Sequence, residues 1–401
     1  MNKLYKYHFS DLYDISSGIS TSKEQAGHGS PFVSFKTVFD NYFLPGELAD
    51  LMDSSSEEQS KYSVKKGDIF VTRTSETVNE LALSCVALKD YPNATYSGFL
   101  KRLRPKKPDL VYEKYIAFFL RSKYFRKVID CNTIMTLRAS FNEDIFSFLD
   151  LYLPEYRQQV SIGNLLFSIE RKIQLNKEIN DNLHQQLMLL YNYWFTQFDF
   201  PDENGKPYKS SGGLMKHNEI MKNFIPENWD IQPIIQIASL YQPQTISNDL
   251  FNNSYPYNVY GGGGLIGKFN QFNHEEPEII LSCRGNCGNV LLTMPYSWIT
   301  GNAMVVHVNK KIVTQTYLYE YLLSYGVQKY VSGSVQKQLT RENLSVMPVI
   351  IPPLDLLTKF DSLTAPIIKA IEINTNETNK LVSLRDWLLP ILMNGQATIT
   401  D

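Results

Sequence analysis

Apolar residues recur at alternating steps of four and three in two long stretches of the chain, a spacing typical of coiled-coil helices. The first seam has eight apolar residues in ten positions: Ile162, Leu166, Ile169, Ile173, Asn176, Asn180, Leu183, Leu187, Leu190 and Trp194. The second seam is Phe360, Thr364, Ile367, Ile371, Asn374, Thr378, Leu381, Arg385, Leu388 and Leu392. The pattern predicts two long helices, over residues 156–197 and 353–395, whose apolar faces need partners.

The economical partner for each helix is the other, and a polar residue near the middle of each seam indicates how they pair. In an antiparallel pair the two midpoints meet, so we expect Asn176 to lie opposite Asn374. A buried Asn pair costs stability but fixes the register, since a slip leaves an amide unpaired among leucines. The alternative is that both side chains face solvent because the seam drifts by one position.

The chain also repeats itself along its length. When Pro154 is placed on Pro352, an offset of 198 positions, matching residues continue without a gap into both predicted helices. Upstream the match is looser: GDIFVTR faces PEIILSCR, and YSGFLKRL faces ITGNAMVV. The repeat predicts two similar domains, 1–155 and 228–352, each followed by a long helix. Residues 198–227, rich in Gly, Pro, Ser and Asn, are predicted to be a linker, and 396–401 a tail.

Short apolar runs separated by turn signals, such as GDIFVT, EIILSC and AMVVHV, predict that both domains are mostly β with appended helices. We therefore expect an α+β protein in which two similar domains are related by a pseudo-twofold axis. A pair of long helices forming an antiparallel coiled coil would separate them.

Composition narrows the function. No apolar run is long enough to span a membrane and the N-terminus has no signal-like apolar region, so the expected compartment is the cytoplasm. A formal charge of −2 argues against a globally basic nucleic-acid protein but allows local basic faces. Cys283 and Cys287 could form half of a zinc site, but no second Cys/His pair has a matching spacing, so no metal is predicted.

The glycine-rich stretch YGGGGLIGKF fits the phosphate-binding pattern G-x-x-x-x-G-K from Gly262 to Lys268. The Ser or Thr that holds Mg²⁺ is replaced by Phe269, and the preceding residues are polar rather than a buried strand. A glycine-rich turn between strands is therefore favoured over a nucleotide loop. No arrangement of residues indicates methyl transfer, a nuclease or a Ser/His/Asp hydrolase, so no catalytic residue is predicted.

Basic residues provide the candidate contacts to DNA. LKRLRPKKPDL concentrates five of them, which could contact phosphates or could lie on a solvated strand edge. Arg73 and Arg284 follow matching strands, where an Arg could pair with guanine or could bind loop carbonyls. The predicted DNA-binding set is Arg73, Lys101, Arg102, Arg104, Lys106, Lys107, Lys268, Arg284 and Arg341.

Taken together, the chain resembles the DNA-specificity subunit of type I restriction-modification systems. The resemblance rests on PYNVYGGGGLIGKF, IILSCRGNCGNVLLTMPYSWITGNAMVV, GKPYKSSGG, IPENW and the IPP or LP before each long helix. It implies two target recognition domains, each reading half of a split site on double-stranded DNA, with the helical pair setting the gap. The first domain matches less well, so its base preference should differ.

The resemblance also implies a non-catalytic subunit on which separate modification and restriction subunits dock. S-adenosylmethionine, ATP and Mg²⁺ would be used by those subunits and not bound by this chain. Two other functions stay open at this point: a nucleotide-binding enzyme that uses the Gly262–Lys268 loop, and a coiled-coil scaffold without DNA contact.

Overall fold

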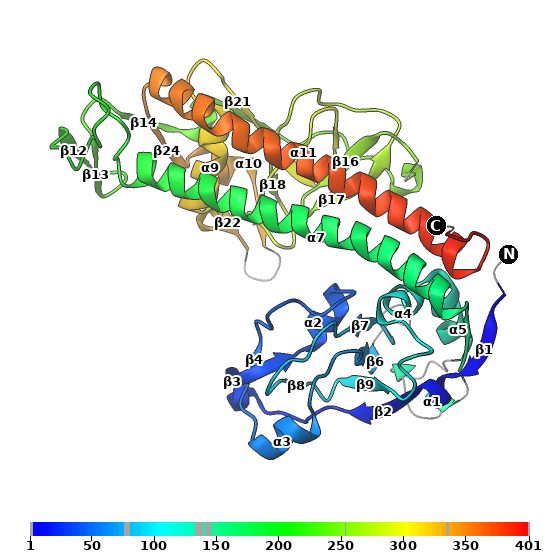
Figure 1. The fold of residues 1–401 in the computed structure, drawn as a ribbon. Helices are drawn as coiled ribbons and strands as arrows, with labels where there is room; N and C mark the ends of the chain where they lie inside the picture. The colour runs from blue at the N-terminus through cyan, green and yellow to red at the C-terminus, as the bar shows by residue number, and fades with distance from the viewer. Residues whose placement is uncertain are drawn as a thin grey trace. The chain divides into compact units, whose positions relative to one another are not determined.

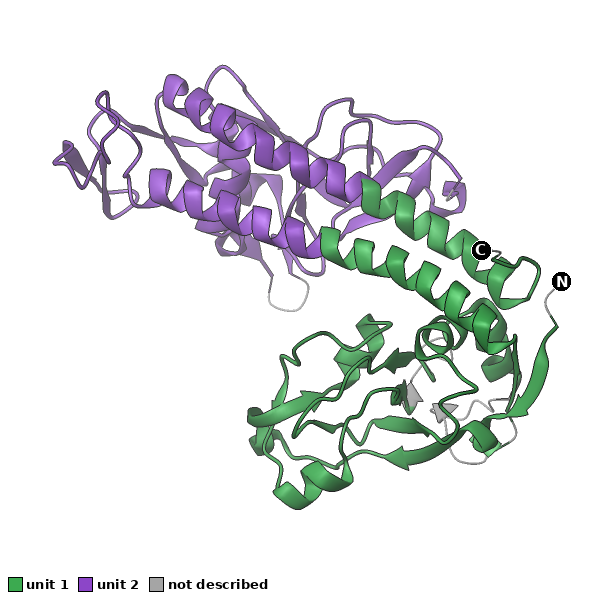
Figure 2. Cartoon of the chain, in the orientation of Figure 1, with its two compact units in different colours: residues 1–176, 377–401 green, residues 177–376 purple. Residues whose placement is uncertain are grey.

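The computed structural model describes residues 3–75, 81–132, 139–140, 146–147, 149–252, 254–333 and 337–399. The chain divides into two compact units, which Figure 2 distinguishes by colour. Unit 1 contains residues 1–176 and 377–401, and unit 2 contains residues 177–376. Each long helix therefore contributes one part to each unit.

Unit 1 is built from short strands and short helices (Figure 1). Its strands are β1 (Tyr5–His8), β2 (Tyr13–Ser17), β3 (Ala26–Val33), β4 (Leu51–Met52), β5 (Ile69–Thr72), β6 (Thr74–Ser75), β7 (Ser84–Val86), β8 (Thr95–Tyr96), β9 (Leu100–Pro105), β10 (Ala139–Ser140) and β11 (Asp150–Leu153). Its short helices are α1 (Phe9–Leu12), α2 (Phe35–Asp40), α3 (Ser56–Lys61), α4 (Glu113–Phe119) and α5 (Lys123–Asn132).

Unit 2 has a corresponding set of elements. Its strands are β12 (Met215–Asn218), β13 (Asn223–Pro226), β14 (Asp230–Pro233), β15 (Ala238–Tyr241), β16 (Tyr257–Gly261), β17 (Gly264–Phe269), β18 (Ile279–Ser282), β19 (Val290–Leu292), β20 (Trp298–Ile299), β21 (Ala303–Val308), β22 (Val331–Ser332), β23 (Gln338–Leu339) and β24 (Pro348–Ile351). Its short helices are α8 (Ile234–Ile237), α9 (Gln315–Tyr325) and α10 (Arg341–Ser345).

The sheets confirm the internal repeat. Unit 1 has a four-stranded sheet in the order β2-β9-β5-β7, and unit 2 has one in the order β15-β21-β18-β19. The pair β1–β11 corresponds to β14–β24, and the parallel pair β3–β8 corresponds to β16–β20. Strands β11 and β24 begin 198 positions apart, as do the long helices that follow them, which is the offset that the sequence predicted.

The four-stranded sheet of unit 1 is buried on both faces. Strand β5, with the sequence IFVT, is buried at every position. Its Ile69 and Val71 pack into one apolar cluster with Leu103, whereas Phe70 packs into another on the opposite face with Leu100. This alternation follows from the two-residue period of a strand. A sheet covered on both sides holds its loops in fixed positions at the strand ends.

The predicted linker, 198–227, is folded. Strands β12 and β13 form an antiparallel hairpin within it. At its start, Phe198 and Phe200 lie with ring centroids 5.4 and 5.2 Å from that of Trp229. The segment is polar in composition, but Phe198 and Phe200 attach it to the apolar core of unit 2.

The two long helices are α7 (Tyr156–Tyr191), coloured green in Figure 1, and α11 (Leu354–Met393), coloured orange to red. A π-helical turn, Asn192–Thr196, extends α7, and Gly395 with a φ of 67° follows the end of α11. The residues at both ends of the first predicted seam are buried. In the second seam, the residues in the middle, from Ile367 to Leu381, are half-buried. These bounds agree with the predicted helices.

The helices pair antiparallel within each unit. In unit 1, Arg385 donates to Glu170 over 2.7 Å, and Asn176 donates to Glu377 over 2.8 Å. In unit 2, the ring centroids of Trp194 and Phe360 are 5.5 Å apart. The side chain of Asn374 also donates a hydrogen bond to that of Asn180. As the residue number rises along α7, that of its partner on α11 falls, so the predicted antiparallel coiled coil is confirmed.

The register differs from the predicted one by one helical turn. Asn374 donates to Asn180 Oδ1 over 3.0 Å, whereas Asn176, fully buried, bonds Glu377 and not Asn374. The prediction that Asn176 meets Asn374 is therefore wrong, although a pair of asparagines does form. The repeat matches one helix to the other in sequence, but it does not encode which residues of the two helices lie opposite each other.

We expect the double substitution Asn180→Leu with Asn374→Leu to stabilise unit 2 by about 1 kcal/mol, because it removes both polar partners and adds apolar contact. Thermal unfolding measures this change. The single variant Asn374→Leu is the control, because it leaves the Asn180 amide without that partner and should lower the unfolding temperature instead. A double variant that is less stable than the single one would contradict the expectation.

No helix among the described residues is both long and apolar enough to cross a membrane.

Candidate nucleic-acid interface

A structured turn lies at the edge of the sheet in unit 1, where β5 ends and β9 begins. The turn is closed by hydrogen bonds from the Leu100 N–H to the Ser97 carbonyl, 2.9 Å, and from the Phe99 N–H to Ser97 Oγ, 3.2 Å. The Arg73 N–H donates to the Phe99 carbonyl over 2.9 Å. The Arg73 side chain is exposed beside this turn, and its Nη1 lies 3.4 Å from the Gly98 carbonyl oxygen.

Unit 2 has the same edge, where β18 ends and β21 begins. The Ala303 N–H donates to the Thr300 carbonyl over 3.0 Å, which closes an equivalent turn. Gly262, at the tip of the β16–β17 hairpin, packs so closely that an added Cβ would lie 2.7 Å from the Asn302 carbonyl oxygen. Arg284 follows β18, its side chain is exposed, and its backbone forms a β-bridge to Gln338.

The two arginines occupy neighbouring rather than equivalent positions. Thr72 pairs with the first residue of β9, and Ser282 pairs with the first residue of β21. Arg73 is thus the first residue past its strand and Arg284 the second. The predicted equivalence is wrong by one residue, because Cys283 lies between the end of β18 and Arg284. Since successive side chains of an extended segment point to opposite sides, the two units present their arginines differently.

The basic run of β9 does not form one exposed patch. Lys101 and Arg102 are buried, with 6% and 8% of their surface exposed. The Arg102 guanidinium donates through Nη1 to the Ser63 carbonyl over 2.7 Å and lies 5.3 Å from the centroid of the Tyr96 ring. The prediction that these two residues contact phosphate is not supported, because apolar clusters cover both faces of β9.

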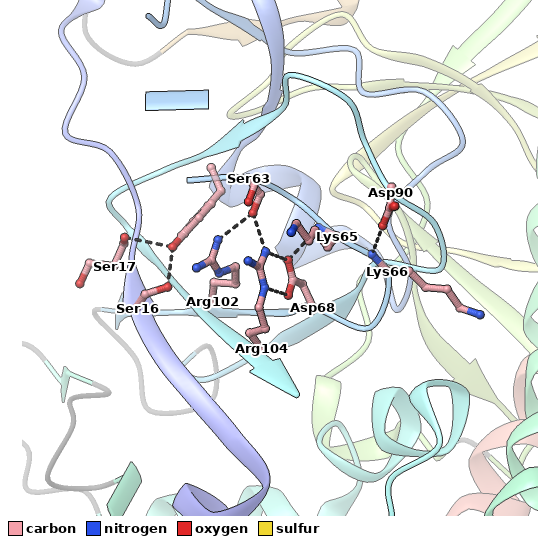
Figure 3. A network of polar contacts seen from close by, with 10 residues as sticks. Ser16, Ser17, Ser63, Lys65, Lys66, Asp68, Asp90, Arg102 and Arg104 are labelled. Atoms are coloured by element: carbon pink, nitrogen blue, oxygen red, sulfur yellow. Dashed lines mark hydrogen bonds and ion pairs between the residues drawn. The ribbon is translucent and has the colours of Figure 1, made fainter. Parts of the chain in front are cut away.

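Arg104 is occupied by an ion pair, drawn in Figure 3. Its Nε and Nη2 donate to the two carboxylate oxygens of Asp68 over 2.7 and 2.6 Å, and Nη2 also donates to the Ser63 carbonyl. The Asp68 side chain is fully buried. The hydrogen bonds with Asp68 raise the pKa of Arg104. Arg104 is therefore a structural residue that neutralises a buried carboxylate, rather than a phosphate contact.

Unit 2 has a polar pair in the equivalent place. Glu278 precedes β18 as Asp68 precedes β5, and its Oε1 lies 2.7 Å from His307 Nδ1 on β21. Burial raises the pKa of Glu278, and the hydrogen bond with His307 partly offsets this rise. In both units, therefore, the acidic residue just before the strand pairs with a basic residue on the neighbouring strand. The basic partner is Arg104 in unit 1 and His307 in unit 2.

The other two basic residues of the run are exposed. Lys106 lies 3.1 Å from an Asp14 carboxylate oxygen and donates to the Ser10 carbonyl, also over 3.1 Å. Lys107 is the next residue along the chain. Both residues remain predicted phosphate contacts. The ion pair between Lys106 and Asp14 is compatible with this prediction, because an exposed ion pair contributes little to stability.

The glycine-rich stretch is a β-hairpin. Strands β16 and β17 pair antiparallel, with Gly262 and Gly263 at the turn and Gly264 at a φ of 113°. Lys268 lies in β17 opposite Asn258, half-buried and at the other end of the strand from the turn. A nucleotide loop needs the lysine at the start of a helix, where backbone N–H groups converge on the phosphates. The predicted turn between strands is confirmed, and the nucleotide-loop alternative is wrong.

Arg341 is the first residue of α10 and is exposed. The side chain of Thr340 caps this helix by accepting a hydrogen bond from the Asn343 N–H over 3.2 Å. Strand β23, which bridges to Arg284 through Gln338, ends directly before Thr340. The structure therefore brings Arg341 and Arg284 to neighbouring segments, and it places Lys268 on a separate strand.

Phe99 and Asn302 are exposed at these edges and were not among the predicted residues. Each directly follows the glycine of its turn and directly precedes the central strand. The sequence could have indicated them, because the aligned segments YSGFLKRL and ITGNAMVV share a Gly that is followed by an aromatic residue in one and an amide in the other.

Among the described residues, no group of three or more His, Cys, Asp or Glu side chains is placed to hold a metal ion. Cys287 Sγ lies 3.2 Å from the Cys283 carbonyl oxygen and 3.1 Å from the Lys337 carbonyl oxygen, and its single S–H can donate to either.

Comparison with known proteins gives a consistent result. Residues 6–185 and 226–382 match the type I restriction modification DNA specificity domain, in two copies. The MjaIX specificity subunit of Methanocaldococcus jannaschii, a type I restriction enzyme subunit, is 20% identical over 98% of this chain and 93% of its own. The HindI specificity subunit of Haemophilus influenzae is 22% identical over 96% of this chain and 98% of its own. A type I restriction-modification S subunit from M. genitalium has a similar fold, with a TM-score of 0.56 at 14% identity over 98% of this chain and 96% of its own.

Proposed function

Because the chain belongs to the type I restriction-modification DNA specificity family, we propose that its two units each read one half of a split target on double-stranded DNA. The duplicated sheet supports this proposal, since it presents an equivalent edge in each unit with an exposed Arg beside it. The two edges carry different side chains, so the two half-sites would differ in sequence. Base contacts specify a site, whereas phosphate contacts mainly position the protein.

Specificity subunits are non-catalytic DNA-recognition components of restriction-modification complexes, and this chain is such a component. Its partners under the proposal are modification subunits and restriction subunits of the same complex. S-adenosylmethionine, ATP and Mg²⁺ would bind to those partners, and the complex would act in the cytoplasm.

The long helices would set the distance between the half-sites. At about 1.5 Å per residue, the 36 residues of α7 make a rod of about 54 Å. A rod held in register by the contact between Asn180 and Asn374 would keep the number of unread base pairs constant.

The proposal is tested by selecting duplexes from a random DNA pool with the purified chain, with and without its methyltransferase partner, at near-physiological salt. The expected result is a split motif with a gap of fixed length. Exchanging residues 1–155 for those of a relative should then change one half of the motif only. Equal recovery of all sequences, with the partner present and folded, would contradict the proposal and favour a scaffold without sequence reading.

We expect Arg284→Ala to weaken binding to the selected duplex by about 2 kcal/mol and to relax one half-site, because an Arg at a base edge makes two hydrogen bonds. Titration of the selected duplex and of single-base variants measures both effects. Lys107→Ala is the matched control, since loss of a phosphate contact should weaken all duplexes alike and lower the salt dependence. Loss of affinity without relaxed preference would reassign Arg284 to phosphate.

A further inference from the structure

The turns that precede β9 and β21 share a backbone frame but differ at the tip. Residues 97–99 form the turn in unit 1, and residues 300–302 form it in unit 2. Each is closed by the same backbone hydrogen bond, from the first residue of the strand to the residue three positions earlier, at 2.9 and 3.0 Å. Each has Gly in the middle and an exposed side chain after it: Phe99 in one unit and Asn302 in the other.

The middle glycines fix these turns against a neighbouring segment. A Cβ on Gly98 would lie 2.8 Å from the Ile19 carbonyl oxygen, and one on Gly301 would lie 2.6 Å from the Pro243 carbonyl oxygen. The Gly98 N–H also donates to the Ile19 carbonyl over 2.7 Å. The side chain at each tip is therefore carried on a backbone that cannot move far, as a site for precise contacts requires.

The tip of unit 1 is apolar and exposed. The exposed fraction of Phe99 is 67%, and its carbonyl accepts a hydrogen bond from the Arg73 N–H. The most exposed Phe described in this unit thus lies beside an exposed Arg, at an edge that the sheet holds rigid. Phe offers an apolar contact that matches the C5-methyl group of thymine in the major groove.

The tip of unit 2 is an amide. Asn302 is exposed, and within the described part of the chain its side chain makes no hydrogen bond. Its neighbours are the Gly262 turn, which packs on its carbonyl, and Ser282, whose hydroxyl donates to the Arg284 carbonyl over 3.1 Å. A free carboxamide is suited to adenine, because it can accept from N6 and donate to N7 of the same base.

We propose that Phe99 and Asn302 are base-reading residues, Phe99 for the methyl group of a thymine and Asn302 for an adenine, one in each half-site. This proposal rests on the proposed function, since it needs both units to contact DNA. Phe99 and Asn302 occupy equivalent positions in the two units. The two units would therefore read different bases because the side chain at this position differs.

The test uses the duplex that the full chain selects with its methyltransferase partner, and it alters single atoms of the bases. Replacing each thymine of one half-site in turn with deoxyuridine removes only a methyl group. At one position this should weaken wild-type binding about tenfold, whereas Phe99→Ala should bind both duplexes equally. Replacing adenines of the other half-site with 7-deazaadenine should in the same way weaken the wild type but not Asn302→Ala.

Phe224→Ala is the matched control, because Phe224 is 53% exposed but lies on the β12–β13 hairpin. It should respond to the altered bases as the wild type does. Thermal unfolding of every variant checks that folding is unchanged. If the wild type selects a split motif and the Phe99 and Asn302 variants stay sensitive to every base change, the assignment is overturned while the proposed function stands. If the wild type selects no motif, the proposed function itself fails.

Discussion

Arg104→Met is expected to destabilise unit 1 by about 3–5 kcal/mol, because it leaves the carboxylate of Asp68 buried without its partner. That carboxylate is fully buried and accepts two hydrogen bonds from Arg104, at 2.6 and 2.7 Å. Among the described residues, the remaining donor to this carboxylate would be the Lys65 N–H, at 2.8 Å, which cannot offset the loss of a charge. Chemical denaturation followed by circular dichroism, fitted with one transition for each unit, measures the loss.

Two further variants make this expectation specific. Lys107→Met removes an exposed charge from the same run and should change the free energy of unfolding by less than about 0.5 kcal/mol. Asp68→Asn combined with Arg104→Met should recover part of the loss, since a neutral amide is easier to bury than a carboxylate. If Arg104→Met is no more destabilising than Lys107→Met, the ion pair does not support the sheet.

Glu320→Gln is expected to stabilise unit 2 by about 3 kcal/mol at pH 8, and by much less at pH 5. Glu320 lies on α9 with an exposed fraction of 4%, at a pocket of about 400 Å³ that it shares with His184 and Met188. Burial raises the pKa of Glu320 to about 7. Above that pH the folded protein holds a buried carboxylate, and the unfolded chain holds a hydrated one.

The sign of this effect follows from proton binding. Between the unfolded pKa of about 4.3 and the folded pKa, the folded state binds more protons than the unfolded state, so stability falls as pH rises. The benefit of Glu320→Gln should therefore be complete above pH 7 and disappear toward pH 4. Burial also lowers the pKa of His184 in the same pocket, so the comparison must be made between variant and wild type at each pH.

Thermal unfolding of unit 2 from pH 5 to pH 8 measures this difference. Glu342→Gln is the control, because it makes the same change of side chain at an exposed position on α10. A Glu320→Gln variant whose stability runs parallel to that of the wild type at every pH would show that the Glu320 carboxyl is solvated.

Patterns that concern single elements were readable from the sequence. The spacing of apolar residues placed both long helices, since one face of a helix reports its burial through a local period. The repeat at an offset of 198 gave the order of the domains, because matched strands and helices follow from matched residues. The missing Ser or Thr after Lys268 correctly favoured a turn over a nucleotide loop.

Contacts between distant segments could not be read in this way. Lys101 and Arg102 appear as part of a basic run, but apolar clusters from elsewhere in unit 1 bury them. The Asn pair forms one turn from its predicted place, and Arg73 and Arg284 differ by one position. In each case the residue type was visible, while its environment depended on how other segments pack.

The sequence by itself thus determined the repeated architecture and the antiparallel helical pair, because these rest on local periodicity and on the similarity of the two halves. Only the tertiary structure decided which basic residues reach the surface, and that Phe99 and Asn302 are presented at equivalent edges. The physical reason is that exposure and neighbourhood come from long-range packing, in which a shift of one residue along a strand turns a side chain to the other face.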